Sequence, residues 1–148
     1  MAFFAKLHPL IVHFPMGLLI SGVVFEIYGA LRKDEVAETA GRFNVRFGFW
    51  CLFPVLIVGF LGMISLENTE KFRSFLSSHL MFAFTTAGFF ISAMLVSYYL
   101  RQPWGRFLYF LIIAVGGGCV LVTGYFGGEL VHRFGVPLGL DLTSNSDL

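Results

Sequence analysis

Four long apolar stretches alternate with short polar segments along the chain. They run from Leu7 to Leu31, Phe47 to Leu66, His79 to Leu100 and Phe107 to Val131. Each stretch has roughly 20 or more residues, and a helix of that length crosses about 30 Å of hydrocarbon. Polar segments at 32–46, 67–78 and 101–106 separate the stretches, and a polar tail follows at 132–148. The pattern predicts one domain over residues 1–148, an all-α integral membrane bundle of four transmembrane helices.

The composition supports a membrane protein and excludes two other classes. Of the 148 residues, 57% are hydrophobic and 13% are charged, whereas a soluble domain is about 25% charged. The net charge is +1 and the ten Lys and Arg residues are scattered, so nothing indicates a nucleic-acid partner. Cys51 and Cys119 each lie inside an apolar stretch without a Cys-x-x-Cys pair, and we expect them to be core residues. The first stretch is too long for a signal peptide, so we expect a retained helix.

Basic residues are distributed unevenly between the two ends of the expected bundle. One end has six of them, namely Arg32, Lys33, Arg42, Arg46, Arg101 and Arg106. The other end has four, namely Lys6, Lys71, Arg73 and Arg133. Because Lys and Arg accumulate on the cytoplasmic side of membrane proteins, this asymmetry predicts that both termini lie on the outer side of a bacterial inner membrane.

The four histidines fall at one end of the predicted bundle. His8 and His13 lie near the start of the first stretch, His79 opens the third and His132 follows the fourth. With four membrane crossings these positions share an end, whichever way the bundle is oriented. Ionisable groups at membrane depth are usually functional, although an interfacial histidine can also simply bond to a backbone carbonyl.

Small residues lie inward of the histidines at helical spacing. Gly128, Gly124 and Gly117 precede His132, Gly17 follows His13, and Ala83 and Thr86 follow His79. Two interpretations remain open at this point. These positions allow either close packing between helices or room for a flat macrocycle against a helix.

A haem b group is the cofactor that this pattern favours. Helical bundles bind haem through axial imidazoles from facing helices, so the candidate iron ligands are His8, His13, His79 and His132. Gly17, Gly124 and Gly128 would line the macrocycle, and Arg73 and Arg133, with Lys6 and Lys71, would pair with its propionates. Zinc or copper bound by four imidazoles is the alternative, but Glu129 is the only carboxylate near His132 in the sequence.

The spacing of His8 and His13 bears on the number of haem groups. Five residues separate them, which places them about 7.5 Å apart along a helix and roughly 140° apart around it. They therefore cannot ligate the same iron from both sides. Two alternatives remain open. In the first, His79 and His132 complete two bis-histidine haems with His8 and His13. In the second, a single haem binds to His13, which lies deeper than His8, and to one partner.

Glu26 is an acidic residue within the first apolar stretch, near the end opposite the histidines. An ion pair with Arg46 of the second stretch is the interpretation that we favour. A role for Glu26 in proton transfer or quinone binding is the alternative.

Two strings resemble the domain-of-unknown-function 2231 family of bacterial membrane proteins. These are His-Pro-Leu-Ile-Val-His-Phe-Pro at 8–15, with Gly17, and Gly-Gly-Glu-Leu-Val-His at 127–132. The resemblance covers most of the chain. Some members are joined to c-type cytochrome domains or lie beside redox proteins, so the resemblance implies electron transfer more than transport.

These observations lead to a functional hypothesis with two rivals. The chain is expected to be an electron-transfer subunit with haem b near the periplasmic face, without catalytic activity of its own. Its expected partners are membrane lipid and other subunits of a respiratory or photosynthetic redox complex, including a c-type cytochrome or a quinone. The rivals are a cofactor-free assembly subunit and a protein that transports or delivers copper or zinc.

Overall fold

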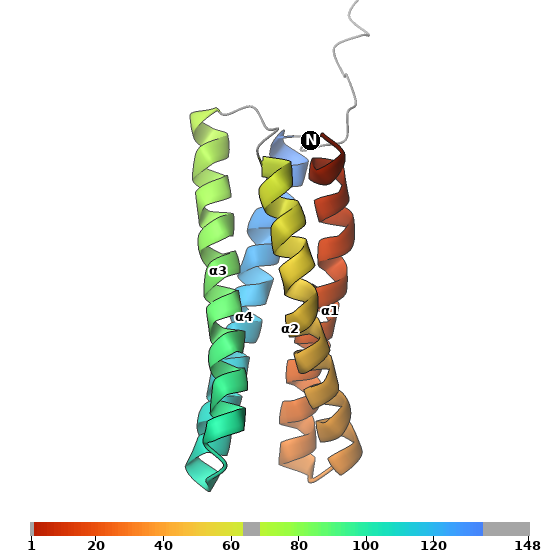
Figure 1. The fold of residues 1–148 in the computed structure, drawn as a ribbon, viewed down its shortest axis with the longest axis vertical. Coiled ribbons are helices and arrows are strands. Elements are labelled where there is room, and N and C mark those ends of the chain that lie inside the picture. Colours follow the sequence, from red (N-terminus) through yellow and green to blue (C-terminus); the bar gives the residue numbers. More distant parts are fainter. Residues whose placement is uncertain (1, 64–68, 135–148) are drawn as a thin grey trace, which may run out of the picture.

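The protein is a bundle of four long helices (Figure 1). The computed structural model describes residues 2–63 and 69–134, with only the backbone at residues 2 and 4–6. The helices are α1 (Ala2–Arg32), α2 (Glu35–Met63), α3 (Glu70–Tyr99) and α4 (Pro103–Phe134). All four are long and apolar enough to cross a membrane. The predicted all-α transmembrane bundle is therefore confirmed.

The helices are longer than the apolar stretches that predicted them. α2 begins at Glu35 and α3 at Glu70, whereas the apolar stretches begin at Phe47 and His79. Each helix has 29–32 residues, which is about 45 Å of helix against about 30 Å of hydrocarbon. The polar segments are thus largely helical, and they carry the helices beyond the apolar layer.

Local signals in the sequence fix where these extended helices begin. Lys33 ends α1 in the left-handed conformation with φ 57°, and the Asp34 N–H donates to Gly29 O at 2.9 Å, as in a Schellman motif. The Asp34 carboxylate then accepts from the backbone N–H groups of Val36 and Ala37, both at 3.1 Å. One residue thereby closes α1 and caps α2. The chain therefore reverses direction within two residues.

The third and fourth helices start on equally clear caps. Thr69 accepts from the Phe72 N–H at 3.4 Å and caps α3. Pro103 is the first residue of α4, where its missing N–H costs nothing. The turn between α3 and α4 is accordingly short, as the proline and glycine at 101–106 predict.

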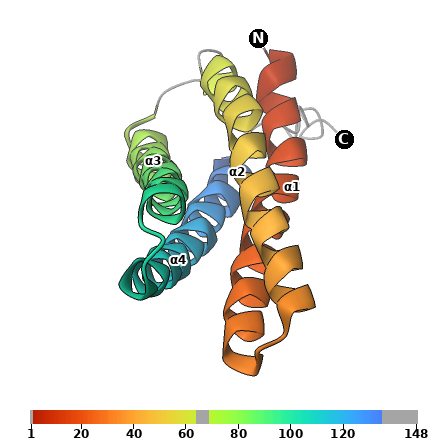
Figure 2. The ribbon, with the colours of Figure 1, turned by 60° about the horizontal axis from the view of Figure 1, so that its bottom comes forward.

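The bundle consists of two hairpins, α1 with α2 and α3 with α4 (Figure 2). The first hairpin packs tightly because its backbones touch at glycines. A Cβ on Gly22 would lie 2.7 Å from the backbone nitrogen of Val45, so only glycine allows this approach. The hairpins meet mainly where α1 packs on α4, and α2 approaches α3 at few positions.

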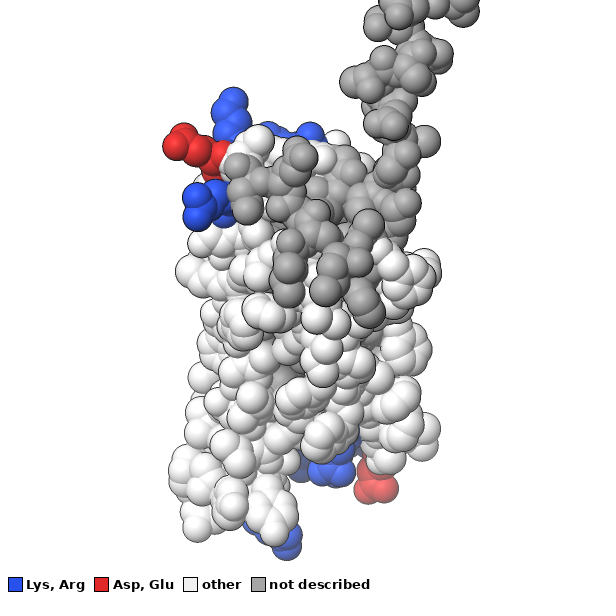
Figure 3. Space-filling model, turned by 45° about the horizontal axis from the view of Figure 1, so that its top comes forward, with Lys and Arg blue, Asp and Glu red and all other residues white. Residues whose placement is uncertain are grey.

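On the face that Figure 3 shows, the charged side chains lie near the two ends of the bundle, and the described surface between them has no Lys, Arg, Asp or Glu. The buried core between the helices consists of Leu19, Val23, Val45, Phe49, Phe90, Ala93, Tyr109, Ile113 and Val120. Many large apolar side chains point outward, such as Leu10 at 75% exposed and Trp50 at 67%. An apolar exterior of this kind suits lipid and not water, so the chain is an integral membrane protein. Which side its termini face stays a prediction.

Candidate cofactor site at the histidine end

The four histidines lie toward the same end of the bundle, as their positions predict. α1 and α3 begin and α4 ends at the upper end of Figure 1. His8 and His13 lie in the first turns of α1, His79 lies nine residues into α3, and His132 lies two residues before the end of α4. Sharing an end does not bring all four together, however.

The structure brings His8 and His79 into direct proximity. Their ring centroids are 6.3 Å apart and the ring planes are perpendicular, at 87°. His8 belongs to the first hairpin and His79 to the second, so the pair bridges the two hairpins. Both side chains are half-buried. A group bound between these rings would lie where the hairpins meet.

Each of the two rings is oriented by a backbone carbonyl of the neighbouring helix. The Nδ1 atom of His8 lies 3.2 Å from Val55 O of α2, and that of His79 lies 3.0 Å from Thr123 O of α4. A carbonyl oxygen can only accept, so Nδ1 carries the proton in both rings. The Nε2 atom of each ring then keeps its lone pair. Metal-binding histidines typically show this arrangement, one nitrogen on a carbonyl and the other free to ligate.

Two glycines make room for these rings against the helix backbones. A Cβ on Gly59 of α2 would lie 2.8 Å from Cε1 and 2.9 Å from Nδ1 of His8. A Cβ on Gly127 of α4 would lie 3.2 Å from Cε1 of His79. Both imidazoles therefore rest on a glycine of the partner helix in their own hairpin. The sequence analysis connected neither glycine with these rings.

The other two histidines lie outside this pair. His13 is exposed, and its Nδ1 donates to Pro9 O of its own helix at 2.7 Å. His132 is also exposed, in the last turn of α4. Both side chains point away from the contacts between helices, so lipid chains or headgroups would surround them. The structure thus favours His8 over the deeper His13 as the inward-facing histidine of α1.

The small residues inward of the histidines differ in whether a neighbouring side chain fills the space beside them. Met16 Cε occupies the position beside Gly124 where a Cβ would go, and Gly117 faces Val23. A Cβ on Gly17 or Gly128 would meet no atom of the described residues within 4 Å. Helix packing therefore uses the first two positions, and the other two leave open space. The role of Gly17, Gly124 and Gly128 in lining a macrocycle stays a prediction.

The basic residues at this end lie at the rim of the bundle. Arg133 forms an ion pair with Glu129 of its own helix and lies over the Phe75 ring of α3, 5.3 Å from its centroid. Arg73 and Lys71 are exposed, and the side chain of Lys6 lies outside the described residues. Pairing of these cations with propionates stays a prediction.

The spacing of the His8 and His79 rings is compatible with two imidazoles that share one metal ion. Metals bind imidazole nitrogen at about 2.0–2.1 Å, so two rings on opposite sides of one metal have centroids about 6 Å apart. The His8–His79 spacing agrees with this value. Within residues 2–63 and 69–134, no group of three or more His, Cys, Asp or Glu side chains could share a metal ion. Two ligands are what haem iron requires, because the porphyrin supplies the rest.

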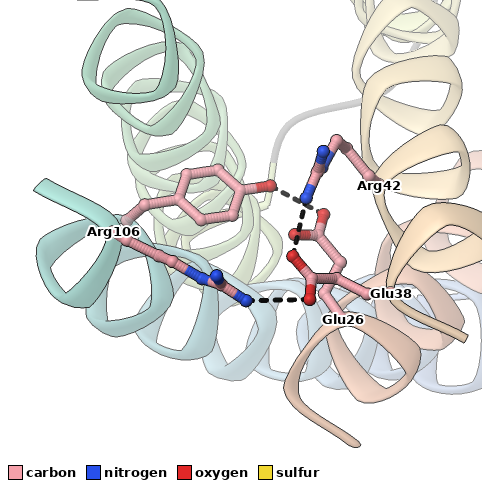
Figure 4. Close-up of polar contacts among 5 residues, drawn as sticks. Glu26, Glu38, Arg42 and Arg106 are labelled. Carbon is pink, nitrogen blue, oxygen red and sulfur yellow. Dashed lines mark hydrogen bonds and ion pairs between the residues drawn. The ribbon is translucent and has the colours of Figure 1, made fainter. Parts of the chain in front are cut away.

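A second polar cluster lies at the opposite end, where Glu26 of α1 is fully buried at 0% exposure. The Tyr109 hydroxyl of α4 donates to Glu26 Oε1 at 2.7 Å (Figure 4). The expected ion pair between Glu26 and Arg46 does not form among the described residues. The reason is the helix register. Gly41 of α2 packs against Glu26, and Arg46 lies five residues, or about 7.5 Å of helix, further along.

The arginines at this end pair instead with Glu38, which the sequence analysis did not single out. Arg42 lies 2.7 Å from Glu38 Oε1, and Arg106 of α4 lies 2.8 Å from Glu38 Oε2 (Figure 4). The second contact joins the two hairpins. Glu38 could have been suspected from its i, i+4 spacing to Arg42, but nothing in the sequence indicated Arg106.

Comparison with known proteins identifies a family for this chain. The model of a family described as "Predicted membrane protein (DUF2231)" matches residues 5–138. No curated protein matches the chain, and no solved structure matches it.

Proposed function

The chain belongs to the DUF2231 family of predicted membrane proteins, and from the geometry of its histidine end we propose that it is a membrane electron-transfer subunit that binds one haem b between His8 and His79. The observation that carries the proposal is the close, perpendicular pair of imidazoles across the two hairpins, with 6.3 Å between centroids. This proposal keeps the expected cofactor, chooses one haem from the two counts that the sequence left open, and takes His8 instead of His13 as the ligand from α1.

All four helices would help to hold the proposed haem. α1 and α3 supply the two imidazoles, and α2 and α4 supply the carbonyls of Val55 and Thr123 that orient them. A ring whose Nδ1–H donates to a carbonyl is a stronger ligand through Nε2 and keeps a fixed direction. Haem bound to this pair would supply a one-electron carrier.

The position of the pair also fits transfer to a partner at that end of the bundle. His8 lies six residues from the start of α1, which is about 9 Å along the axis. In the proposed orientation this end faces the periplasm, where a c-type cytochrome domain or a larger redox complex would exchange electrons with it.

Single alanine variants of the four histidines test the proposal. The protein is purified in detergent after expression with a haem supply, and haem per chain is measured by the pyridine haemochrome assay. We expect a ratio near one for the parent protein, with a reduced-minus-oxidised spectrum of a b-type cytochrome. His8→Ala and His79→Ala lose the haem, while His13→Ala and His132→Ala are matched controls and retain it.

Three results would contradict the proposal. A colourless parent protein excludes haem, and bound copper or zinc that depends on His8 and His79 would indicate metal delivery instead. If His13→Ala loses the haem while its expression and helix content match those of the parent protein, His13 and not His8 is the ligand from α1. A ratio near two would require a second pair of ligands.

A further inference from the structure

The end of the bundle opposite the histidines has a polar cavity of about 220 Å³. All four helices and the turn between α3 and α4 contribute to its walls. The walls include Glu26, Glu38, Tyr109 and four arginines, namely Arg42, Arg46, Arg101 and Arg106. Since a water molecule in the liquid takes about 30 Å³, the cavity has room for a polar headgroup. Its charged lining is unusual for a space that adjoins an apolar core.

Positive charge is in excess in this cavity. Glu38 engages both Arg42 and Arg106. Arg46 and Arg101 have no carboxylate within ion-pair distance in the described part of the chain. Two guanidinium groups are thus left to bind an anion, and guanidinium is the side chain that best matches phosphate oxygens.

An apolar groove leads from this cavity to the outer face of the bundle. The groove, about 380 Å³, lies between α2 and α3 and includes Phe49, Trp50, Met94 and Tyr98 in its walls. Arg46, Ser97 and Arg101 line both the groove and the cavity. Trp50 is 67% exposed and Tyr98 66%, so the groove opens on the lipid-facing side. It exists because α2 approaches α3 at few positions.

One oxygen in the cavity still lacks a donor. Glu26 Oε1 accepts from Tyr109, but Glu26 Oε2 is buried and has no hydrogen-bond partner among the described residues. A buried carboxyl oxygen without a donor costs free energy. A ligand that carries a hydroxyl group beside its phosphate would supply the missing donor.

We propose that the arginine-lined cavity and the groove between α2 and α3 bind an acidic phospholipid from the adjacent leaflet, with phosphate on Arg46 and Arg101, a headgroup hydroxyl near Glu26, and an acyl chain along the groove. Phosphatidylglycerol has this chemistry. Basic pockets between transmembrane helices commonly bind acidic headgroups. A neutral quinone headgroup would leave the two guanidinium charges without a counterion, which is why the structure favours the phospholipid.

Tryptophan quenching tests the proposal at the groove itself. Trp50 lines the groove, and the chain has two tryptophans, so Trp104→Phe leaves Trp50 as the single reporter. This protein is reconstituted in phosphatidylcholine vesicles that contain a minor fraction of either brominated phosphatidylglycerol or brominated phosphatidylcholine. We expect the acidic lipid to quench Trp50 with an apparent preference of about five-fold or more, the contribution of one or two basic contacts.

Charge variants then assign that preference to the cavity. Arg46→Gln with Arg101→Gln abolishes it, whereas Arg46→Lys with Arg101→Lys retains much of it. Arg32→Gln with Lys33→Asn is the matched control, because it removes two charges from the same end at exposed positions outside the cavity and leaves the preference unchanged. Helix content by circular dichroism checks that every variant is folded.

The proposal is overturned by any of three results. Equal quenching by both brominated lipids in the parent protein excludes a selective site. An equal loss in the control and in the glutamine variant indicates a general attraction to the charged end. Selective quenching by decylubiquinone, without a preference for phosphatidylglycerol, would identify a quinone site instead.

Discussion

Substitution of Gly59 by alanine tests the placement of His8 without depending on any cofactor. The new Cβ would lie 2.8 Å from Cε1 and 2.9 Å from Nδ1 of the His8 ring. Carbon atoms in contact are ordinarily about 3.5–4.0 Å apart, so the ring has to retreat by at least about 0.7 Å. The same substitution at Gly88 is the matched control, because a Cβ there meets nothing within 4 Å.

The cost follows from the contacts that the ring would lose. The His8–Val55 hydrogen bond is already 3.2 Å long, and its loss costs about 1 kcal/mol. Overpacking adds about 1–3 kcal/mol, and alanine returns about 0.5–1 kcal/mol of helix propensity. We therefore expect Gly59→Ala to lower the free energy of unfolding by about 1–3 kcal/mol, and Gly88→Ala to leave it unchanged or slightly raised.

Unfolding in mixed micelles with an increasing fraction of SDS, followed by circular dichroism, measures the difference. A double-mutant cycle with His8→Ala identifies the cause, because the penalty at Gly59 should disappear once the ring is removed. If Gly59→Ala is as stable as Gly88→Ala, or keeps its penalty in the His8→Ala background, His8 does not rest on α2 as described.

Three further predictions concern other parts of the bundle. Tyr109→Phe removes the hydrogen bond that Glu26 Oε1 accepts and should cost about 1–3 kcal/mol in the same unfolding assay, whereas Tyr98→Phe, at an exposed position, should cost little; equal effects would contradict the buried Tyr109–Glu26 contact. Gly127→Ala should destabilise by less than the α2 substitution, because its Cβ would approach His79 only to 3.2 Å; a larger loss would contradict this placement. A C-terminal alkaline phosphatase fusion should be active if both termini face the periplasm; an inactive fusion, with a cytoplasmic reporter that is bright, would reverse the orientation.

The sequence predicted the bundle because hydropathy is a strong signal for membrane helices. Four apolar stretches of sufficient length require four crossings. The same signal could not locate the helix ends. Hydropathy shows which residues suit the apolar layer, whereas a helix ends where its backbone hydrogen bonds end. Asp34 and Thr69 set the starts of α2 and α3 well before the apolar residues begin, and capping residues of this kind are the signal that would have corrected the boundaries.

The candidate site was predictable only in part. Counting the crossings correctly put the histidines toward one end, but it could not decide which histidine of α1 faces inward. His8 and His13 lie roughly 140° apart around the helix, so the choice depends on how α1 packs on α2. That packing is visible in the structure at Gly59. The carbonyls of Val55 and Thr123 that orient the rings have no sequence signature at all, because every residue has a carbonyl.

The polar contacts between the hairpins are concentrated at the two ends of the bundle. The His8–His79 pair joins them at one end, and Tyr109–Glu26 with Arg106–Glu38 joins them at the other. Inside a bilayer, apolar side chains gain little by leaving lipid for a helix interface, so association depends on close packing and on polar contacts. Close packing is strong within each hairpin and weaker between them.

The relative position of the hairpins is therefore determined largely by a few residues near each end. His8 and Glu26 are 18 residues apart on α1, which is about 27 Å along the helix, too far for the two clusters to touch. They nevertheless act on the same interface, because each joins the first hairpin to the second. A haem between the imidazoles and a phospholipid in the arginine cavity would each add contacts across this interface. His8, His79 and Glu26 thus belong both to the contacts that join the hairpins and to the proposed binding sites, so bound ligands would strengthen a loosely packed interface.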